Sequence, residues 1–140
     1  MWDCVHTGFI FGPPVAMGRP RMTRQGRTYT PAKSREYMAD AVDQIQKQYG
    51  DAEQLANQPL RLQLVFVHKR PARIKCTQRT PKTTKPDIDN LIKMVMDAIT
   101  KSGIWLDDNI VTEVAASDWY ANEYEQPHVM YSIYTQRPEL

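Results

Sequence analysis

The chain of 140 residues contains little cysteine and no long hydrophobic run. Its two cysteines, Cys4 and Cys76, cannot form a disulfide framework and lack the paired spacing of zinc or redox motifs. The longest strongly apolar run, residues 64–67, is far shorter than the roughly 20 residues of a membrane span. No basic segment followed by an apolar stretch opens the sequence, so we expect no secretory signal. These absences favour the reducing cytoplasm and a protein without a membrane partner.

Nothing in the sequence divides it into parts. Domains usually hold about 100–150 residues, and we find no internal repeat and no long linker. Hydrophobic residues make up 41% of the chain and charged residues 24%, which excludes collagen, coiled coil and wholesale disorder. We therefore expect a single domain over residues 1–140.

Acidic residues are absent from two long segments. Residues 19–35 contain six basic residues and residues 69–85 contain seven, and neither segment contains an acid. Residues 1–86 carry a net charge of +9, whereas residues 87–140 carry −7. Either basic segment alone is as readily a solvated surface, but the two together indicate contact with nucleic-acid phosphates. The basic residues that we expect to bind DNA are Arg19, Arg21, Arg24, Arg27, Lys69, Arg70, Arg73, Lys75, Arg79, Lys82 and Lys85.

Hydrophobic spacing predicts two helices. Apolar residues recur every three or four positions over residues 38–49, between the N-cap candidate Thr30, followed by a proline in the first turn, and the stop residue Gly50. A second stripe covers residues 91–99 and stops at Gly103. Trp105 and the tyrosines are expected in the core or an interface rather than stacked on bases.

Strands are predicted at residues 4–11, 60–68, 110–115 and 129–134, with a short strand at 27–29. The last two long strands are joined by a polar connection, residues 121–127, and are expected to be antiparallel. The order β-α-β-α-β-β predicts an α+β domain, with two main helices packed on one mixed, mostly antiparallel sheet.

Basic loops are expected at about residues 13–29 and 69–86. The second loop contains three prolines and shows no apolar periodicity. It therefore contributes little to a core, and we expect it to be mobile until a ligand binds.

Two pairs of carboxylates flank the second predicted helix. Asp87 and Asp89 stand at its start, Asp107 and Asp108 follow its end, and Lys93 lies one turn after Asp89 on the same face. Clustered carboxylates repel one another, and a hard divalent cation with oxygen ligands relieves the repulsion. Each feature alone is more often a helix cap, a turn or a solvated pair. The combination, with a basic loop leading into the first pair, favours a metal site.

Other carboxylate and metal motifs do not fit. An EF-hand needs Asp or Asn at position 91 and Gly at 92, where Leu91 and Ile92 stand. A restriction-type nuclease needs an acid two residues before a lysine, and this chain has none. The three histidines are isolated and lack zinc-ligand spacing.

The segment that holds both carboxylate pairs resembles the signature of RusA-type Holliday junction resolvases, D-x-D-N-L-x-K, a helix, and G-x-W-x-D-D. The close match is Asp87-Ile88-Asp89-Asn90-Leu91-Ile92-Lys93, Asp97-Ala98, Gly103-Ile104-Trp105-Leu106-Asp107-Asp108 and Val111. A looser match extends to Pro13-Pro14, Arg19-Pro20-Arg21 and Arg27-Thr28-Tyr29.

The resemblance implies a homodimeric, Mg²⁺-dependent endonuclease that resolves four-way DNA junctions by paired symmetric nicks in recombination or repair. The family's catalytic and metal-binding carboxylates correspond to Asp87, Asp89 and Asp108, and its catalytic lysine to Lys93, with Asp107 supporting the site. No small-molecule cofactor is implied. Two alternatives remain open, a non-catalytic DNA-binding module and a metal nuclease that acts on other branched DNA.

Overall fold

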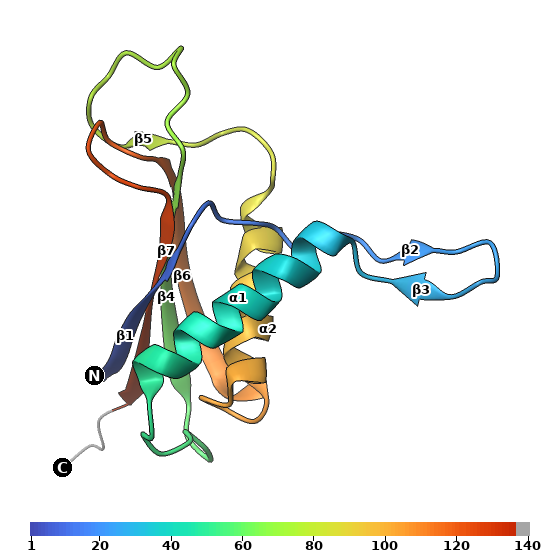
Figure 1. The fold of residues 1–140 in the computed structure, drawn as a ribbon. Helices are drawn as coiled ribbons and strands as arrows, with labels where there is room; N and C mark the ends of the chain where they lie inside the picture. The colour runs from blue at the N-terminus through green and yellow to red at the C-terminus, as the bar shows by residue number, and fades with distance from the viewer. Residues whose placement is uncertain (137–140) are drawn as a thin grey trace.

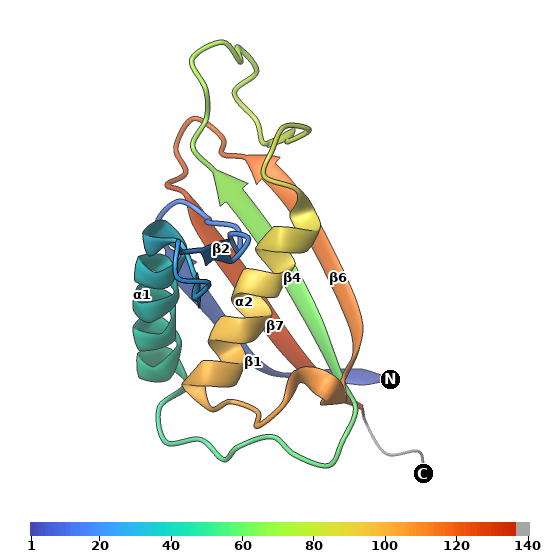
Figure 2. The ribbon, with the colours of Figure 1, turned by 90° about the vertical axis from the view of Figure 1, so that its right-hand side faces the viewer.

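The computed structural model describes residues 1–136, in which two helices cover one face of a five-stranded sheet (Figures 1 and 2). The elements in chain order are β1 (Trp2–Phe11), β2 (Arg21–Met22), β3 (Thr28–Tyr29), α1 (Ala32–Tyr49), β4 (Leu60–His68), β5 (Thr80–Pro81), α2 (Ile88–Ser102), the short 3-10 helix η1 (Asp108–Ile110), β6 (Val111–Tyr120) and β7 (His128–Gln136). The predicted α+β class and its mixed sheet are confirmed.

The strand order in the main sheet is β1-β7-β4-β6-β5. β4 and β6 run parallel, as their long crossover through α2 allows, and the other neighbours are antiparallel. The last two long strands, β6 and β7, run antiparallel to each other as expected, but they are not neighbours, because β4 lies between them. The connection after β6 passes the end of β4, where the Ala121 N–H donates to the His68 carbonyl at 2.8 Å.

The core lies between the sheet and its helices. The alternating residues Leu60, Leu62, Leu64 and Phe66 of β4 are buried, as their period of two predicts. α2 buries the stripe Leu91, Met94, Val95, Ala98 and Ile99 against them. Trp105 is fully buried as expected of a core residue.

The C-terminal ends of the helices agree with the sequence-based prediction better than their N-terminal ends do. Gly103 adopts the left-handed conformation with φ of 88°, which glycine favours, and its N–H donates to the Thr100 carbonyl at 3.1 Å. The prediction of Thr30 as the N-cap of α1 is wrong by one residue. Pro31 occupies that position instead of the first turn, with an extended ψ of 143°, and no side chain caps the helix.

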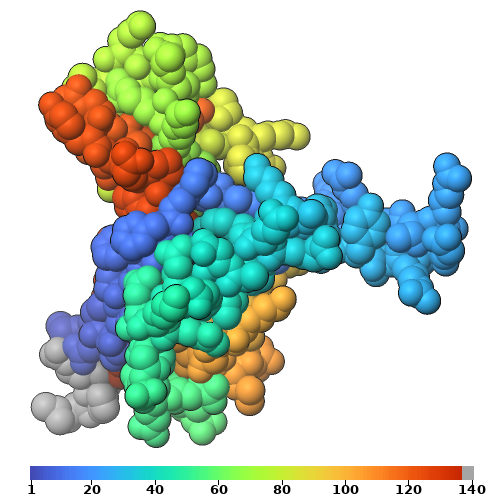
Figure 3. Space-filling view, viewed as in Figure 1, coloured from blue at the N-terminus to red at the C-terminus, as the bar shows by residue number. Residues whose placement is uncertain are grey.

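The first basic segment forms an arm. Residues 21–29 fold into a small hairpin, with Arg21 opposite Tyr29 and Met22 opposite Thr28. The arm stands clear of the rest of the surface (Figures 1 and 3). The short strand expected at 27–29 is therefore confirmed, and its partner β2 is an addition.

The second basic segment is held by specific bonds rather than loose. It contains β5, which pairs with the end of β6. Arg70 donates to the Ile74 carbonyl at 3.0 Å, and the Glu123 N–H donates to the Thr77 carbonyl at 3.1 Å. Polar contacts thus take the place of the missing apolar ones in the loop that we expect to be mobile until a ligand binds. No helix within residues 1–136 has the length and apolar character that a membrane crossing requires.

Candidate active site

The first carboxylate pair opens α2. Asp87 is the N-cap residue, yet its side chain makes no capping hydrogen bond. The Asp89 carboxylate accepts a hydrogen bond from the N–H of Asn90 at 3.0 Å, and both acids are exposed. The ordinary capping role therefore does not account for Asp87, whose carboxylate is available to a ligand.

The second pair lies beyond the other end of α2. The Asp107 carboxylate accepts the Asn109 N–H at 3.0 Å and so stabilises the turn of η1, which fits a supporting role. Asp108 approaches Asp97 of α2. Burial raises the pKa of the Asp97 carboxyl, Lys93 opposes that rise, and the Asp108 carboxylate adds to it.

One chain does not gather the predicted metal ligands. The Asp108 carboxylate approaches Asp97, which lies eight residues after Asp89 in α2, and at about 1.5 Å per residue Asp89 and Asp97 are roughly 12 Å apart along the helix. Among residues 1–136, no group of three or more His, Cys, Asp or Glu side chains is placed to hold a metal ion. Asp87 and Asp89 share one end of α2, whereas Asp108 lies near Asp97 and Lys93.

A cavity of about 530 Å³ adjoins Asp87. Its lining includes Lys82 from the basic loop and Asp118 and Trp119 from β6. A further cavity of about 340 Å³ is lined by Arg19 at the base of the arm together with Lys93 and Asp97. The two basic segments therefore border cavities that each contain a residue of the predicted site, Asp87 in the first and Lys93 in the second.

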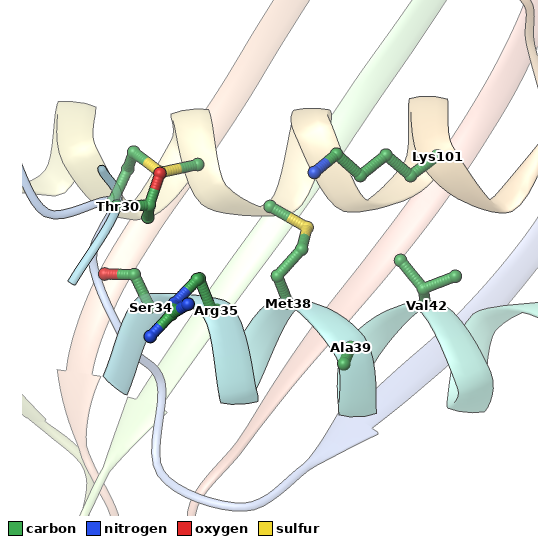
Figure 4. Close-up of a pocket in the computed structure, with 8 residues that line it drawn as sticks. Thr30, Ser34, Arg35, Met38, Ala39, Val42 and Lys101 are labelled. Atoms are coloured by element: carbon green, nitrogen blue, oxygen red, sulfur yellow. The ribbon is translucent and has the colours of Figure 1, made fainter. Parts of the chain in front are cut away.

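Another cavity, of about 520 Å³, lies between α1 and α2, where Met38 and Val42 face Lys101 (Figure 4). No carboxylate lines it. It therefore lacks the groups that hydrolysis of a phosphodiester requires, and we assign it no part in the site.

Two residues near Asp87 were not predicted. His68 Nε2 lies 2.6 Å from Asp118 Oδ1, and the Lys82 ammonium lies 4.0 Å from Asp118 Oδ2. Burial lowers the pKa of the His68 ring, and the Asp118 carboxylate opposes that shift. The strand predicted at 110–115 ended before Asp118, so no periodic signal marked this acid as an inward residue.

The predicted DNA-binding residues fall into two groups. Some are already engaged in the second basic segment: Arg79 binds Glu125, Arg73 lies 5.9 Å from the ring centre of Tyr120, and Lys82 is nearly buried. The exposed group, which is free to meet a ligand without unfolding the loop, contains Arg19, Arg21, Arg24, Arg27, Lys69, Lys75 and Lys85.

Glu125→Gln is expected to destabilise the protein at neutral pH and much less in acid. Three hydrogen bonds from the Arg79 side chain, two from its Nε at 2.8 and 3.0 Å and one from its Nη2 at 2.5 Å, and one from the Asn122 N–H hold the pKa of Glu125 at about 2, against an ordinary 4.5. Because the folded-state pKa is the lower one, this stabilisation is present above pH 4.5 and declines as the pH falls toward 2. We expect a loss of about 1–2 kcal/mol in the free energy of unfolding at pH 7.

Urea denaturation of both proteins at pH 7 and pH 3.5 measures this effect. The neighbouring exposed acid supplies the control, and Glu123→Gln should change stability little at either pH. An equal loss at both pH values for Glu125→Gln would contradict the assignment.

The chain matches the family model for endodeoxyribonuclease RusA over residues 12–133. It belongs to the RusA endodeoxyribonuclease family. The match includes the arm, both helices and both carboxylate pairs, so the resemblance read from the signature extends across nearly the whole fold. As a family member, this RusA-type chain is an endodeoxyribonuclease.

Two proteins are similar in sequence to this RusA-family chain. It is 32% identical over 100 residues to the crossover junction endodeoxyribonuclease RusA of Escherichia coli K12, covering 71% of this chain and 72% of that protein. It is 30% identical over 133 residues to YqaN of Bacillus subtilis, an uncharacterized protein, covering 86% of this chain and 91% of YqaN.

Proposed function

We propose that this chain is a Mg²⁺-dependent Holliday junction resolvase of the cytoplasm, which binds four-way DNA and makes paired symmetric nicks. One observation carries the proposal. The Asp87 carboxylate has no capping role, lies next to Asp89 at the start of α2, and lines a cavity beside the basic segment. The family membership supports the choice of a phosphodiester as the substrate.

The metal ligands fit this proposal only in part within one chain. The exposed carboxylates of Asp87 and Asp89 suit a hard cation, but Asp108 lies beside Asp97, further along α2. A two-fold dimer in which two α2 helices lie antiparallel would bring Asp108 of each protomer toward Asp87 and Asp89 of the other. We therefore propose a homodimer with two shared sites.

The roles of the chain's own residues follow from their chemistry. Mg²⁺ bound by the carboxylates supplies a Lewis acid and lowers the pKa of bound water. Lys93, one turn after Asp89 on α2, supplies positive charge to the phosphate as negative charge develops on it. The exposed basic residues of the arm and loop hold the DNA backbone, which gives affinity with little sequence information.

A labelled four-way junction incubated with the protein tests the proposal. With Mg²⁺ we expect paired nicks at symmetric positions, and with EDTA we expect a mobility shift and intact strands. Intact strands under both conditions would favour a non-catalytic module. Preferential cutting of flaps or forks in a substrate panel would favour a nuclease for other branched DNA.

Replacement of Arg21, Arg24 and Arg27 by Gln is expected to weaken junction binding and its salt dependence. The arm makes strand pairs only within itself, so these exposed side chains can change without disturbing the main sheet. Each lost phosphate contact lowers the slope of log affinity against log salt by about 0.9. We expect a decrease of up to about three, measured by titration in EDTA at several salt concentrations.

The exposed Lys47 on α1 provides the control for this measurement. Its side chain pairs with Asp43 away from both basic segments, and Lys47→Gln should leave affinity and salt slope unchanged. An unchanged slope in the triple variant would exclude the arm from backbone contact.

A further inference from the structure

A buried polar cluster joins β4, β5 and β6 beside Asp87. The exposed fractions of the side chains are 9% for Asp118, 11% for His68 and 5% for Lys82. Asp118 lies between the other two, 2.6 Å from the His68 ring and 4.0 Å from the Lys82 ammonium. Three polar groups thus share a position that is almost closed to water.

The cluster is not needed to complete the apolar core. Asp118 is the register partner of Phe66 on β4, which is fully buried. Burying a charge is unfavourable unless it is well paired, and an apolar side chain at such a position is often equally stable. A buried acid, lysine and histidine together therefore favour a role beyond packing.

The same cluster anchors the segment that leads into the active site. The Lys82 N–H donates to the Asp118 carbonyl at 3.0 Å, directly after β5 ends. The Lys82 ammonium donates to the Thr84 carbonyl at 2.6 Å, and the Thr84 and Tyr120 hydroxyls lie 2.8 Å apart. Residues 82–84 are thereby bound to β6 at several points.

This anchoring bears directly on Asp87. Only residues 83–86 separate Lys82 from the N-cap of α2, and Lys82, Asp87 and Asp118 line the same cavity of about 530 Å³. The position of Lys82 on β6 therefore limits where the Asp87 carboxylate can lie. The catalytic geometry of such sites must be held to well under 1 Å.

We propose that Asp118 is a positioning residue for the reaction. It holds Lys82 on β6, so that residues 82–86 place the Asp87 carboxylate at its cavity. The inference rests on the proposed function for its catalytic consequence, whereas the anchoring itself is a property of the fold. Asp118 needs no contact with DNA or metal in this role.

Asp118→Asn tests both parts with separate measurements. Amide hydrogen exchange reports the anchoring. We expect the amides of Lys82, Asn90 and Leu91, which donate to the carbonyls of Asp118 and Asp87, to exchange about tenfold faster while the amides of β1 and β7 are unchanged. Single-turnover cleavage of a saturating junction reports the consequence. We expect a rate lower by about tenfold to a hundredfold, a higher Mg²⁺ concentration for half-maximal rate, and junction affinity in EDTA within about twofold of the original.

Matched variants make the result specific. Glu113→Gln changes an exposed acid on the same strand and should alter none of these readouts. Lys82→Arg, which keeps the charge, should retain more activity than Lys82→Met. If Asp118→Asn does not fold, Lys82→Met and Tyr120→Phe, which remove the neighbouring contacts, provide the same comparison.

The outcomes separate this inference from the proposed function. Unchanged protection of the Lys82, Asn90 and Leu91 amides in Asp118→Asn would overturn the anchoring, whether or not the protein cuts DNA. Faster exchange with an unchanged cleavage rate and Mg²⁺ dependence would overturn the catalytic consequence alone. An original protein that cuts no junction would contradict the proposed function, and the exchange result would still decide the anchoring.

Discussion

Asp89→Asn is expected to lower the rate of junction cleavage by at least about a hundredfold while junction binding persists or tightens. The substitution removes one negatively charged oxygen ligand and keeps the size of the side chain. Asp89 is exposed and its main local contact is the Asn90 N–H, so the fold should be unaffected. Loss of a negative charge also reduces repulsion of DNA phosphates, which is why affinity should not fall.

Single-turnover cleavage with Mg²⁺ and gel-shift titration in EDTA measure the two quantities. Asp51→Asn, an exposed acid remote from α2 in the sequence, is the matched control and should cut at the original rate. Cleavage by Asp89→Asn at the original rate would show that the site has been assigned to the wrong residues.

Mixing two inactive variants tests whether the site is shared between protomers. A mixed dimer of Asp89→Asn and Asp108→Asn chains has one site that bears both substitutions and one that bears neither, if each site combines the two chains. We therefore expect the mixture to regain single nicks, although each variant alone is inactive. A mixture that stays inactive after exchange of protomers would place both acids of a site in the same chain.

Trp105→Ala is expected to have the largest effect on stability, a loss of about 3–5 kcal/mol in the free energy of unfolding. The indole is fully buried, and its Nε1 donates to the Thr100 hydroxyl of α2 at 2.7 Å. Truncation leaves a cavity where the chain turns from α2 toward η1 and removes one hydrogen bond to the Thr100 hydroxyl, which still donates to the Met96 carbonyl at 2.9 Å. The free energy of unfolding of a domain of this size is only about 5–15 kcal/mol, so we expect partial unfolding at moderate temperature.

Urea denaturation followed by far-ultraviolet circular dichroism measures this loss without relying on indole fluorescence. Leu106→Ala, at the next position, is the control because that side chain is 80% exposed. It should change stability by less than about 0.5 kcal/mol. A loss below about 1 kcal/mol for Trp105→Ala would show that the surroundings collapse into the vacated space.

The sequence predicts local elements of this fold well and their arrangement less well. The apolar stripe of α2 and its stop at Gly103 depend on residues within a few positions of one another, and the structure confirms both. The position of β4 between β6 and β7 depends on contacts between residues far apart in the sequence. The connection between β6 and β7 therefore did not reveal that the two strands are not neighbours. The N-cap of α1 was displaced because Pro31 takes an extended ψ that Thr30 was expected to have.

For the candidate site, too, the sequence predicted the local features better than their arrangement in space. Both carboxylate pairs and Lys93 were found from their spacing along the chain, but α2 is a rigid spacer that separates the pairs within one protomer. Nearness in sequence therefore did not mean nearness in space. Asp118 and His68 are 50 positions apart and meet only because β4 and β6 are parallel neighbours, which no local pattern predicts.

The placement of β7 has a consequence for how the protein is made. β7 is the last strand of the sequence, yet it lies inside the sheet, bonded to β1 on one side and to β4 on the other. While the ribosome is still translating β6, β1 therefore has no strand to pair with, and its Ile10, which is fully buried in the folded protein, lies beside unpaired backbone groups. The sheet can close only after β7 has been translated, and because its strand pairs join distant parts of the sequence we expect it to form slowly.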